Sequence, residues 1–302
     1  MLRVSRSRRR EALLGYLYLS PFILGFLIFT AGPMLASLGL SFTEYRVTSP
    51  PKFVGLQNFR TALTDDSLFW PSLGRTFYYT LVTTPIVIVG SLIVAILLNQ
   101  GIKGTTVFRT AFFLPHLTPM VAAALLWLII LDPDGGVLNY MLSLVGIKGP
   151  GWFTSPQWAI PAFIVMSTWM GVGGNRMLIF LAGLQGVPQS LYDAALIDGA
   201  NAWQRFVHVT VPMISPTIFF NMVLTILGHL RIFAAAMVAT QGGPAYATWF
   251  FALHIYKQAF EYFEMGYGSA LAWLFLLVLL LFTFVQFRSS SRWVYYEGEA
   301  RS

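Results

Sequence analysis

Two arginines stand inside strongly hydrophobic stretches of the sequence, where a charged side chain is costly and therefore informative. Arg231 lies in the segment GHLRIF next to His229, and its own stretch contains no acidic residue. Such a guanidinium either lines a polar cavity, where it contacts substrate or closes a gate, or pairs with a carbonyl or carboxylate of another helix. Both interpretations stay open. The first makes Arg231 and His229 candidate residues of a substrate pathway.

The second arginine, Arg176, follows Asn175 toward the end of another apolar stretch. Here the favoured interpretation is that the side chain extends to the cytoplasmic interface, because long basic side chains keep their stems in lipid and their charged heads in water. Asn175 still counts as a candidate for the pathway. Trp169 is a further candidate, since its flat face could stack on a sugar ring, although most tryptophans of such stretches serve packing and the interfacial belt.

Several kinds of enzymatic site are excluded by motif. None of the four lysines follows a glycine, so the glycine-rich phosphate loop with its lysine is missing from the sequence. The four histidines never form H-E-x-x-H, and no G-x-S-x-G nucleophile elbow occurs. His116 and His254 are more typical of hydrogen-bonded structural histidines than of metal ligands. We therefore expect that the chain is not an enzyme and binds no metal or cofactor itself.

The composition indicates an integral membrane protein. Of the 302 residues, 56% are hydrophobic and 10% are charged, and the mean hydropathy is +0.67. A membrane-spanning helix needs ~20 mostly apolar residues. Segments that meet this requirement predict an all-α protein with six transmembrane helices: Leu13–Leu40, Thr76–Leu98, Thr110–Leu131, Trp158–Leu184, Met213–Thr240 and Tyr267–Phe287.

Proline and glycine interrupt several of these segments. Membrane helices tolerate such residues where a neighbouring helix or a wet cavity satisfies the freed backbone groups. We therefore expect bent helices around a pathway, with the bends near Pro85, Pro115, Pro119, Pro161, Gly171, Gly173 and Gly174.

The distribution of basic residues predicts the orientation. The formal net charge of +7 includes five arginines before the first apolar segment, which is too long for the core of a signal peptide and is read as a retained span. With that end in the cytoplasm, the inner segments hold eleven Lys and Arg and the outer segments six. We expect both termini in the cytoplasm, a basic tail at residues 1–12, and no nucleic-acid partner.

The stretch from Gln189 to Pro212 is polar but ordered in pattern. Apolar residues recur at helical spacing on both sides of Asp198-Gly199, a pair that ends a helix and turns the chain. Two short amphipathic helices are predicted, the first beginning after Pro188 and the second ending at Pro212. A helix pair lying on lipid headgroups is the alternative, but such helices are rich in Lys and Arg, and this stretch has only Arg205. A protein partner is favoured.

This stretch, YDAALIDGA followed by Trp203, Phe206, Val209 and Pro212, resembles the cytoplasmic E-A-A loop of permease subunits of binding-protein-dependent ABC importers. Further motifs make the chain similar to the maltose-type carbohydrate permeases over nearly its whole length: FVGLQNF, FRTAFFLP, FLAGLQGVP, GGP and ALAW. Two departures stand out. Asp193 occupies the position where that loop has Glu, and Arg231 stands where members often have Lys or Gln.

The resemblance implies that the loop docks into a groove of a separate ATPase subunit. The residues to which it assigns this coupling role are Asp193, Ala194, Ala195, Asp198, Gly199, Trp203 and Phe206. It also implies a transmembrane domain over residues 13–288 with the coupling loop at 189–212, and a cytoplasmic tail at 289–302. The implied partners are a second homologous permease, two ATPase subunits that bind ATP and Mg, an extracytoplasmic solute-binding protein and a sugar.

These expectations describe a multi-pass permease of the bacterial plasma membrane that imports a sugar, in particular an oligosaccharide, by alternating access. A polyol such as glycerol phosphate is an alternative substrate. An ion-coupled secondary transporter would show carboxylates within its spans and a repeat between its halves, and the sequence shows neither. A membrane assembly factor without transport activity is a third possibility.

Overall fold

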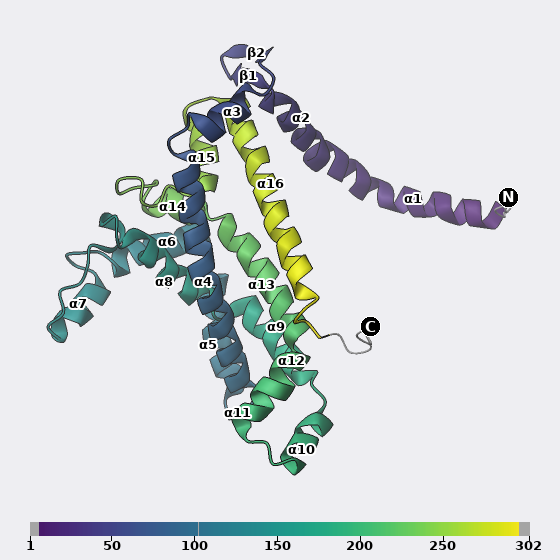
Figure 1. Cartoon of the computed structure of the whole chain (residues 1–302), viewed down its shortest axis with the longest axis vertical. Helices are drawn as coiled ribbons and strands as arrows, with labels where there is room; N and C mark the ends of the chain where they lie inside the picture. Colours follow the sequence, from purple (N-terminus) through teal and green to yellow (C-terminus); the bar gives the residue numbers. More distant parts are fainter. Residues whose placement is uncertain (1–5, 102, 296–302) are drawn as a thin grey trace. The chain divides into compact units, whose positions relative to one another are not determined.

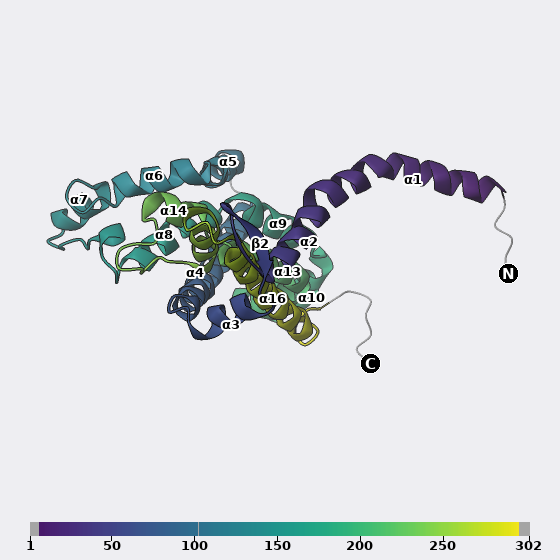
Figure 2. The same cartoon turned by 90° about the horizontal axis from the view of Figure 1, so that it is seen from above.

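The computed structural model describes residues 6–101 and 103–295, and Figures 1 and 2 show its labelled elements. Helices dominate this part of the chain, which confirms the mostly helical membrane fold. Of the expected terminal tails, Arg3 and Arg301 lie outside the described residues. The segments form two compact groups that are described separately: residues 6–66 with 255–274, and residues 67–254 with 275–295.

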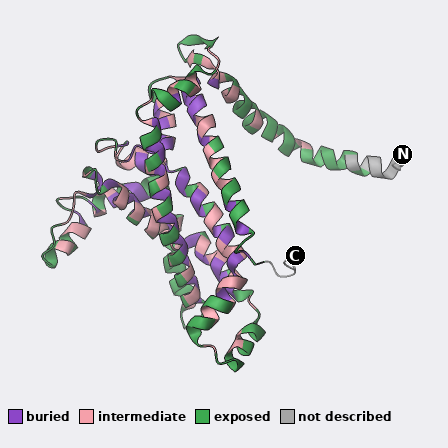
Figure 3. Cartoon of the chain, viewed as in Figure 1, coloured by how far each residue is buried: buried purple, intermediate pink, exposed green. Residues whose placement is uncertain are grey.

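The first group begins with a long helical span. It consists of α1 (Arg6–Phe26), the π turn η1 (Leu27–Ala31) and α2 (Gly32–Ser41). The candidate span runs from Leu13 to Ser41, and 0% of its most apolar window is buried inside the structure. Figure 3 shows exposed residues along most of α1 and α2. Its apolar side chains are therefore available to lipid or to another protein.

A small β-hairpin follows, which the expectation of an all-α fold missed. Strand β1 (Thr43–Arg46) pairs antiparallel with β2 (Ser49–Phe53), and α3 (Gln57–Thr64) comes next. Two prolines in β2 argue against a strand in the sequence, but in a two-stranded sheet both strands are edges, where proline is tolerated. Asn58 Nδ2 donates to the carbonyl oxygens of Ser41 and Thr43, both at 2.9 Å. These bonds hold α3 against the base of the hairpin.

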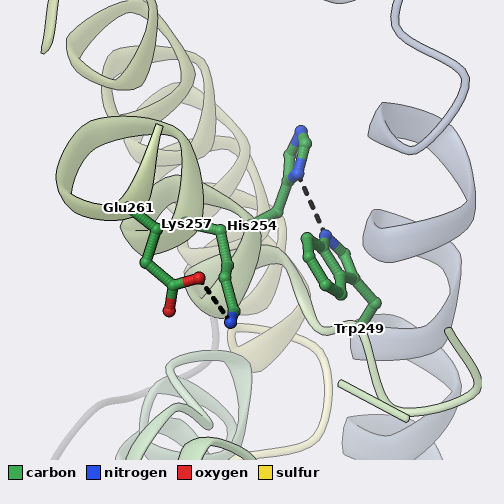
Figure 4. Close-up of polar contacts among 4 residues, drawn as sticks. All are labelled: Trp249, His254, Lys257 and Glu261. Carbon is green, nitrogen blue, oxygen red and sulfur yellow. Dashed lines mark hydrogen bonds and ion pairs between the residues drawn. The ribbon is translucent and has the colours of Figure 1, made fainter. Parts of the chain in front are cut away.

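Two ion pairs belong to the same group. Lys257 Nζ lies 2.6 Å from Glu261 Oε2 within the π turn η4 (Lys257–Glu261), as Figure 4 shows, and the Lys257 side chain is only 11% exposed. Arg46 lies 2.9 Å from Glu264, and both side chains are well exposed. The burial of Lys257 makes the first pair the more important one for stability.

In the second group, α4 (Phe69–Leu98) is the central helix. It packs against α8 (Ala159–Gly171), α9 (Gly174–Gln185) and α13 (Ser215–Leu230). Many polar residues on its buried face are threonine or serine, and Thr76 and Thr83 donate to the carbonyl oxygens four residues earlier. Small hydroxyl side chains that satisfy themselves in this way allow helices to approach closely in a membrane.

The membrane-spanning helices agree with the predicted segments in place and differ in shape. Four are long and apolar enough to cross a bilayer alone: Leu13–Ser41, Phe69–Leu98, Ser215–Ala239 and Met265–Ser290. The third and fourth predicted spans are instead bent pairs: α5 (Thr105–Leu117) with α6 (Met120–Ile130) at 98°, and α8 with α9 at 50°.

Both breaks fall where the sequence carries its helix-interrupting residues. Pro119 separates α5 from α6, and Gly173 separates α8 from α9. A Cβ at Gly173 would lie 1.8 Å from the carbonyl oxygen of Phe112, which belongs to α5. Only glycine permits this approach of the two backbones. The bend of one span is thereby packed directly on the other.

Shorter elements complete the second group. They are α7 (Val137–Leu144), the 3-10 turn η2 (Trp152–Thr154), α10 (Gln189–Ile197), α11 (Ala202–Arg205), the π turn η3 (Phe206–Thr210), α12 (Val211–Met213) and α14 (Ala234–Ala239). Helices α15 (Phe251–Tyr256) and α16 (Met265–Ser290) each have residues in both groups. Near α15, Trp249 Nε1 donates to His254 Nδ1 at 3.1 Å within the protein interior (Figure 4). His254 is thus the hydrogen-bonded structural histidine that we expected.

Candidate functional site

The stretch after α9 forms the two predicted short helices with a glycine turn between them. Helix α10 begins directly after Pro188 and ends at Ile197, with Asp198 as its C-cap, and α11 begins at Ala202. Gly199 has a φ of +78°, in the left-handed region that glycine adopts most easily. The turn places the two helices beside one another at one end of the second group (Figure 1).

This element presents apolar side chains to its surroundings. Ile197 is 87% exposed and Trp203 is 70% exposed, and the Trp203 ring lies 5.6 Å from that of Phe206. Asp193, Ala194 and Asp198 are exposed beside them, while Ala195 is half-buried. Exposed tryptophan and isoleucine next to carboxylates are typical of a protein-binding surface. The structure gathers all seven predicted coupling residues on one element, and their coupling role stays a prediction.

Hydrogen bonds make the element rigid. Tyr192 on α10 shares a 2.9 Å hydrogen bond with the buried Thr210, which lies beyond α11. Asn201 and Gln204 form a capping box, in which each side chain accepts from the other residue's backbone N–H. The N-x-x-Q spacing of this capping box is readable from the sequence, whereas the Tyr192–Thr210 bond is a tertiary contact that spacing does not reveal.

We expected the second helix to end at Pro212, and this prediction is wrong. Helical backbone continues from α11 through η3 and α12 to Met213, and only Ile214 separates it from α13. The π turn just before Pro212 already departs from the regular i to i−4 hydrogen-bond pattern, so a residue without an N–H is accommodated there. The element is therefore directly continuous with a membrane span.

A cavity of about 500 Å³ lies among the helices of the second group. Small-molecule sites in proteins usually measure ~300–1,000 Å³. Its polar lining comes from five elements or their ends: Tyr79, His116, Thr118, Ser167, Arg176, His229 and Arg231. Arg231 and His229, which the sequence placed on a possible pathway, therefore do share one cavity.

Arg176 lines the same cavity. The prediction that its side chain extends to the cytoplasmic interface is therefore wrong. Its side chain is half-buried, and its Nε donates a 2.6 Å hydrogen bond to Oγ1 of Thr225 on α13. Arg176 is the third residue of α9, directly after the break with α8, so the bend turns this side chain toward α13 instead of along the span. The glycines near position 173 predicted a bend, but predicting this contact requires the direction of the bend, which the sequence does not supply.

The remaining polar groups of the cavity are held by neighbours on other helices. Nδ1 of His229 lies 3.0 Å from the Thr84 hydroxyl, and the Tyr79 hydroxyl lies 2.5 Å from that of Ser167. Arg231 follows the last residue of α13 and donates from Nε to the carbonyl oxygen of Leu227 at 3.1 Å. The cavity thus combines buried, oriented hydroxyl and imidazole groups with a more exposed guanidinium.

Two candidates from the sequence do not line this cavity. Asn175 is exposed and is not among its lining residues. Trp169 lines a separate hollow with Phe112 and Pro115, and its ring packs edge-to-face on Trp127 at 5.9 Å. Conversely, His116 does line the cavity, although the sequence suggested only a structural role for it. The Pro115–Pro119 spacing around it was the signal that this segment is irregular.

The topology, the exposed helix pair and the polar cavity can be compared with known proteins. A family model described as the inner membrane component of binding-protein-dependent transport systems matches residues 68–294. The chain belongs to this family. Within the family it is 43% identical to the probable ABC transporter permease protein YesP of Bacillus subtilis (strain 168), over 99% of this chain and 97% of that protein.

Other members of the permease family have named substrates. The chain is 35% identical to the lactose transport system permease protein LacF of Rhizobium radiobacter, over 90% of this chain and 92% of that protein. Among solved structures, it is similar to a chain of a bacterial alginate ABC transporter in complex with an alginate pentasaccharide-bound periplasmic protein, with a TM-score of 0.84 and 26% identity over 96% of this chain and 98% of that chain. These relatives are permease subunits of ABC importers, as the sequence motifs predicted.

Proposed function

We propose that this chain is one of two homologous permease subunits in an ATP-driven importer that moves an oligosaccharide across the bacterial plasma membrane. Names of relatives support the substrate class, since they include lactose, trehalose/maltose and arabinooligosaccharide transport systems. In this proposal each bent helix pair counts as one span, which gives six spans with both termini in the cytoplasm. An extracytoplasmic solute-binding protein delivers the sugar, and two ATPase subunits bind ATP and Mg.

The observation that carries the proposal is the exposed α10–α11 element. Its carboxylates, Asp193 and Asp198, can meet basic groups of a partner. Its apolar side chains Ile197 and Trp203 are 87% and 70% exposed among the described residues. The sequence lacks a nucleotide-binding lysine of its own, so the partner is inferred to be the ATPase.

The structure offers a direct mechanical route from this surface to the cavity. Helical backbone runs from Ala202 to Met213 and, after Ile214, continues as α13, whose 16 residues span ~24 Å. Arg231 and His229 lie at the far end of α13. A rigid displacement of the α10–α11 element by ATP-driven closure of the ATPases would therefore tilt α13 and reshape the cavity, as alternating access requires.

This proposal is tested by reconstituting the importer with charge and backbone variants of the coupling element. Asp193→Arg and Gly199→Pro should abolish sugar-stimulated ATP hydrolysis and uptake while the protein still inserts, because proline cannot adopt the φ of +78° at that turn. Asp134→Arg makes the same charge change at an exposed loop elsewhere and should leave transport unchanged. Normal uptake by both coupling variants would refute the coupling role.

An ion-coupled secondary transporter is not favoured, because the chain belongs to the binding-protein-dependent transport family and its named relatives are transport system permeases. If the substrate is a polyol, the importer takes up the polyol, and added oligosaccharides do not compete with that uptake. Competition by an oligosaccharide but not by glycerol 3-phosphate would support the sugar.

A further inference from the structure

The polar cavity of the second group has an unusual balance of hydrogen-bonding groups. Arginine side chains only donate hydrogen bonds and always carry a positive charge, and two of them, Arg176 and Arg231, line this cavity. Its lining residues include no Asp, Glu, Asn or Gln among the described part of the chain. The side-chain acceptors are therefore limited to a few hydroxyl and imidazole groups.

The two guanidinium groups also lack a negative partner nearby. Arg176 donates to Thr225 and Arg231 donates to a carbonyl oxygen of its own helix, and the ion pairs found among the described residues do not include either of them. The sequence explains why: between residues 67 and 254 the only acidic residues are Asp132, Asp134, Asp193 and Asp198, two in one loop and two in the coupling element. The charges are thus uncompensated by the helices that hold them.

An uncompensated cation within a membrane-spanning domain is costly unless water or a ligand solvates it. The hydroxyl and imidazole groups of the lining can hydrogen-bond a neutral sugar, but such a sugar brings no negative charge to offset the two guanidinium groups. A carboxylate supplies acceptors alone and forms strong, short hydrogen bonds with guanidinium groups. The cavity therefore complements an anionic ligand better than a neutral one.

We infer that the transported oligosaccharide carries a carboxylate, as a uronic acid unit does, and that Arg176 and Arg231 bind this group in the cavity. This inference rests on the proposed function and narrows its substrate class. The Nε–Thr225 bond fixes one edge of the Arg176 guanidinium, so its terminal nitrogens are oriented before substrate arrives. Arg231 is more exposed and closes on the same ligand from the end of α13.

The absence of cysteine from the sequence makes a direct binding test possible. In the assembled transporter, Ala234→Cys places the only thiol of this chain in the cavity lining, and its modification is read on this chain after separation from the other subunits. Its rate of modification by a small uncharged thiol reagent is measured with increasing concentrations of paired disaccharides: diglucuronate and cellobiose, and the corresponding galacturonate/galactose and mannuronate/mannose pairs. Each pair shares linkage and configuration and differs in the carboxylate at carbon 6.

In at least one pair the acidic disaccharide should protect the thiol at a concentration roughly tenfold or more below its neutral counterpart. Equal or better protection by the neutral sugar in every pair would overturn the inference and leave the proposed sugar permease standing. Protection by none of these saccharides, and by none of lactose, maltose and an arabinooligosaccharide tested beside them, would contradict the proposed function and the inference together. The two failures are therefore distinguishable.

Arginine variants show whether the preference comes from this cavity. Arg231→Gln and Arg176→Gln should each reduce the acid-to-neutral preference roughly tenfold, whereas Arg176→Lys should retain part of it because the charge remains. Arg288→Gln removes an exposed charge near the end of α16 and should change nothing. If Arg176→Gln fails to assemble, Arg231→Gln decides alone, since its described side-chain bond is within its own helix. An unchanged preference in that variant would overturn the inference.

Discussion

Nε of Arg176 on α9 donates a 2.6 Å hydrogen bond to Oγ1 of Thr225 on α13. Thr225 is 0% exposed, and its helix also ends at the cavity with His229 and Arg231. One hydroxyl group therefore connects the bent fourth span to the helix that continues into the exposed coupling element. Changes at Thr225 should affect substrate handling without touching the substrate.

Thr225→Val removes this hydroxyl while keeping the shape of the side chain. We expect the KM for uptake to rise roughly tenfold, because a buried hydrogen bond to a charged group is lost and the guanidinium is no longer oriented. The maximal rate should change less. Thr225→Ser should restore the KM, and a Ser variant as impaired as the Val variant would show that packing matters here and the hydrogen bond does not.

Gly173→Ala should destabilise the protein strongly. The new Cβ would lie 1.8 Å from the Phe112 carbonyl oxygen, and backbone on both sides must shift to relieve the overlap, at a cost of ~1–3 kcal/mol or more. Thermal unfolding in detergent measures the loss. Gly74→Ala is the matched control, because a Cβ there meets no atom of the described residues within 4 Å, and its helical position should gain up to ~1 kcal/mol.

The two ion pairs of the first group should differ in importance. Glu261→Gln leaves the poorly exposed Lys257 with a weaker acceptor and should lower stability by about 1–3 kcal/mol. Glu264→Gln breaks the exposed pair with Arg46 and should change stability by only ~0–1 kcal/mol, with the effect vanishing in high salt. Equal losses in thermal unfolding would contradict this difference.

Asn201→Ala should loosen the coupling element without affecting the membrane spans. Loss of an N-cap side chain costs ~0.5–2 kcal/mol, because the backbone N–H of Gln204 loses its acceptor, while the backbone N–H of residue 201 can still donate to Gln204 Oε1. We expect reduced sugar-stimulated ATP hydrolysis at an unchanged global unfolding temperature. Asn201→Asp can still accept from the N–H of Gln204 and should remain close to normal; a similar defect in both variants would point to a direct partner contact instead.

Much of the fold follows from the sequence, because apolar runs of sufficient length leave few alternatives to membrane helices. Pro119 and the glycines around position 173 marked the irregular places correctly. They did not give the angles of 98° and 50°, nor the contact between Gly173 and Phe112, which are 61 positions apart in the chain. The β-hairpin was missed because Pro50 and Pro51 disfavour strands in general.

Part of the candidate site is also readable from the sequence, and part of it depends on tertiary packing. The coupling element is local, so the start of α10 after Pro188 and the turn at Gly199 are readable from the sequence, whereas the predicted end at Pro212 was wrong. The cavity is assembled from Tyr79, His116 and Arg176 with residues of α13, which are brought together only by packing. The cost of a charge in a membrane singled out Arg231, which lines the cavity and whose pathway role stays a prediction. Arg176 was misplaced because the sequence indicated a bend near Gly173 without its direction.

The acid-free lining of the cavity also bears on how the membrane keeps its ion gradients. Fixed arginine charges in a narrow pathway repel sodium ions and protons, as they do in selective pores. With Arg176 and Arg231 in the lining and no acidic residue beside them among the described residues, we expect the pathway to resist cation leakage while it changes between its open forms. The same two side chains would then preserve the ion gradients across the membrane as well as bind the substrate.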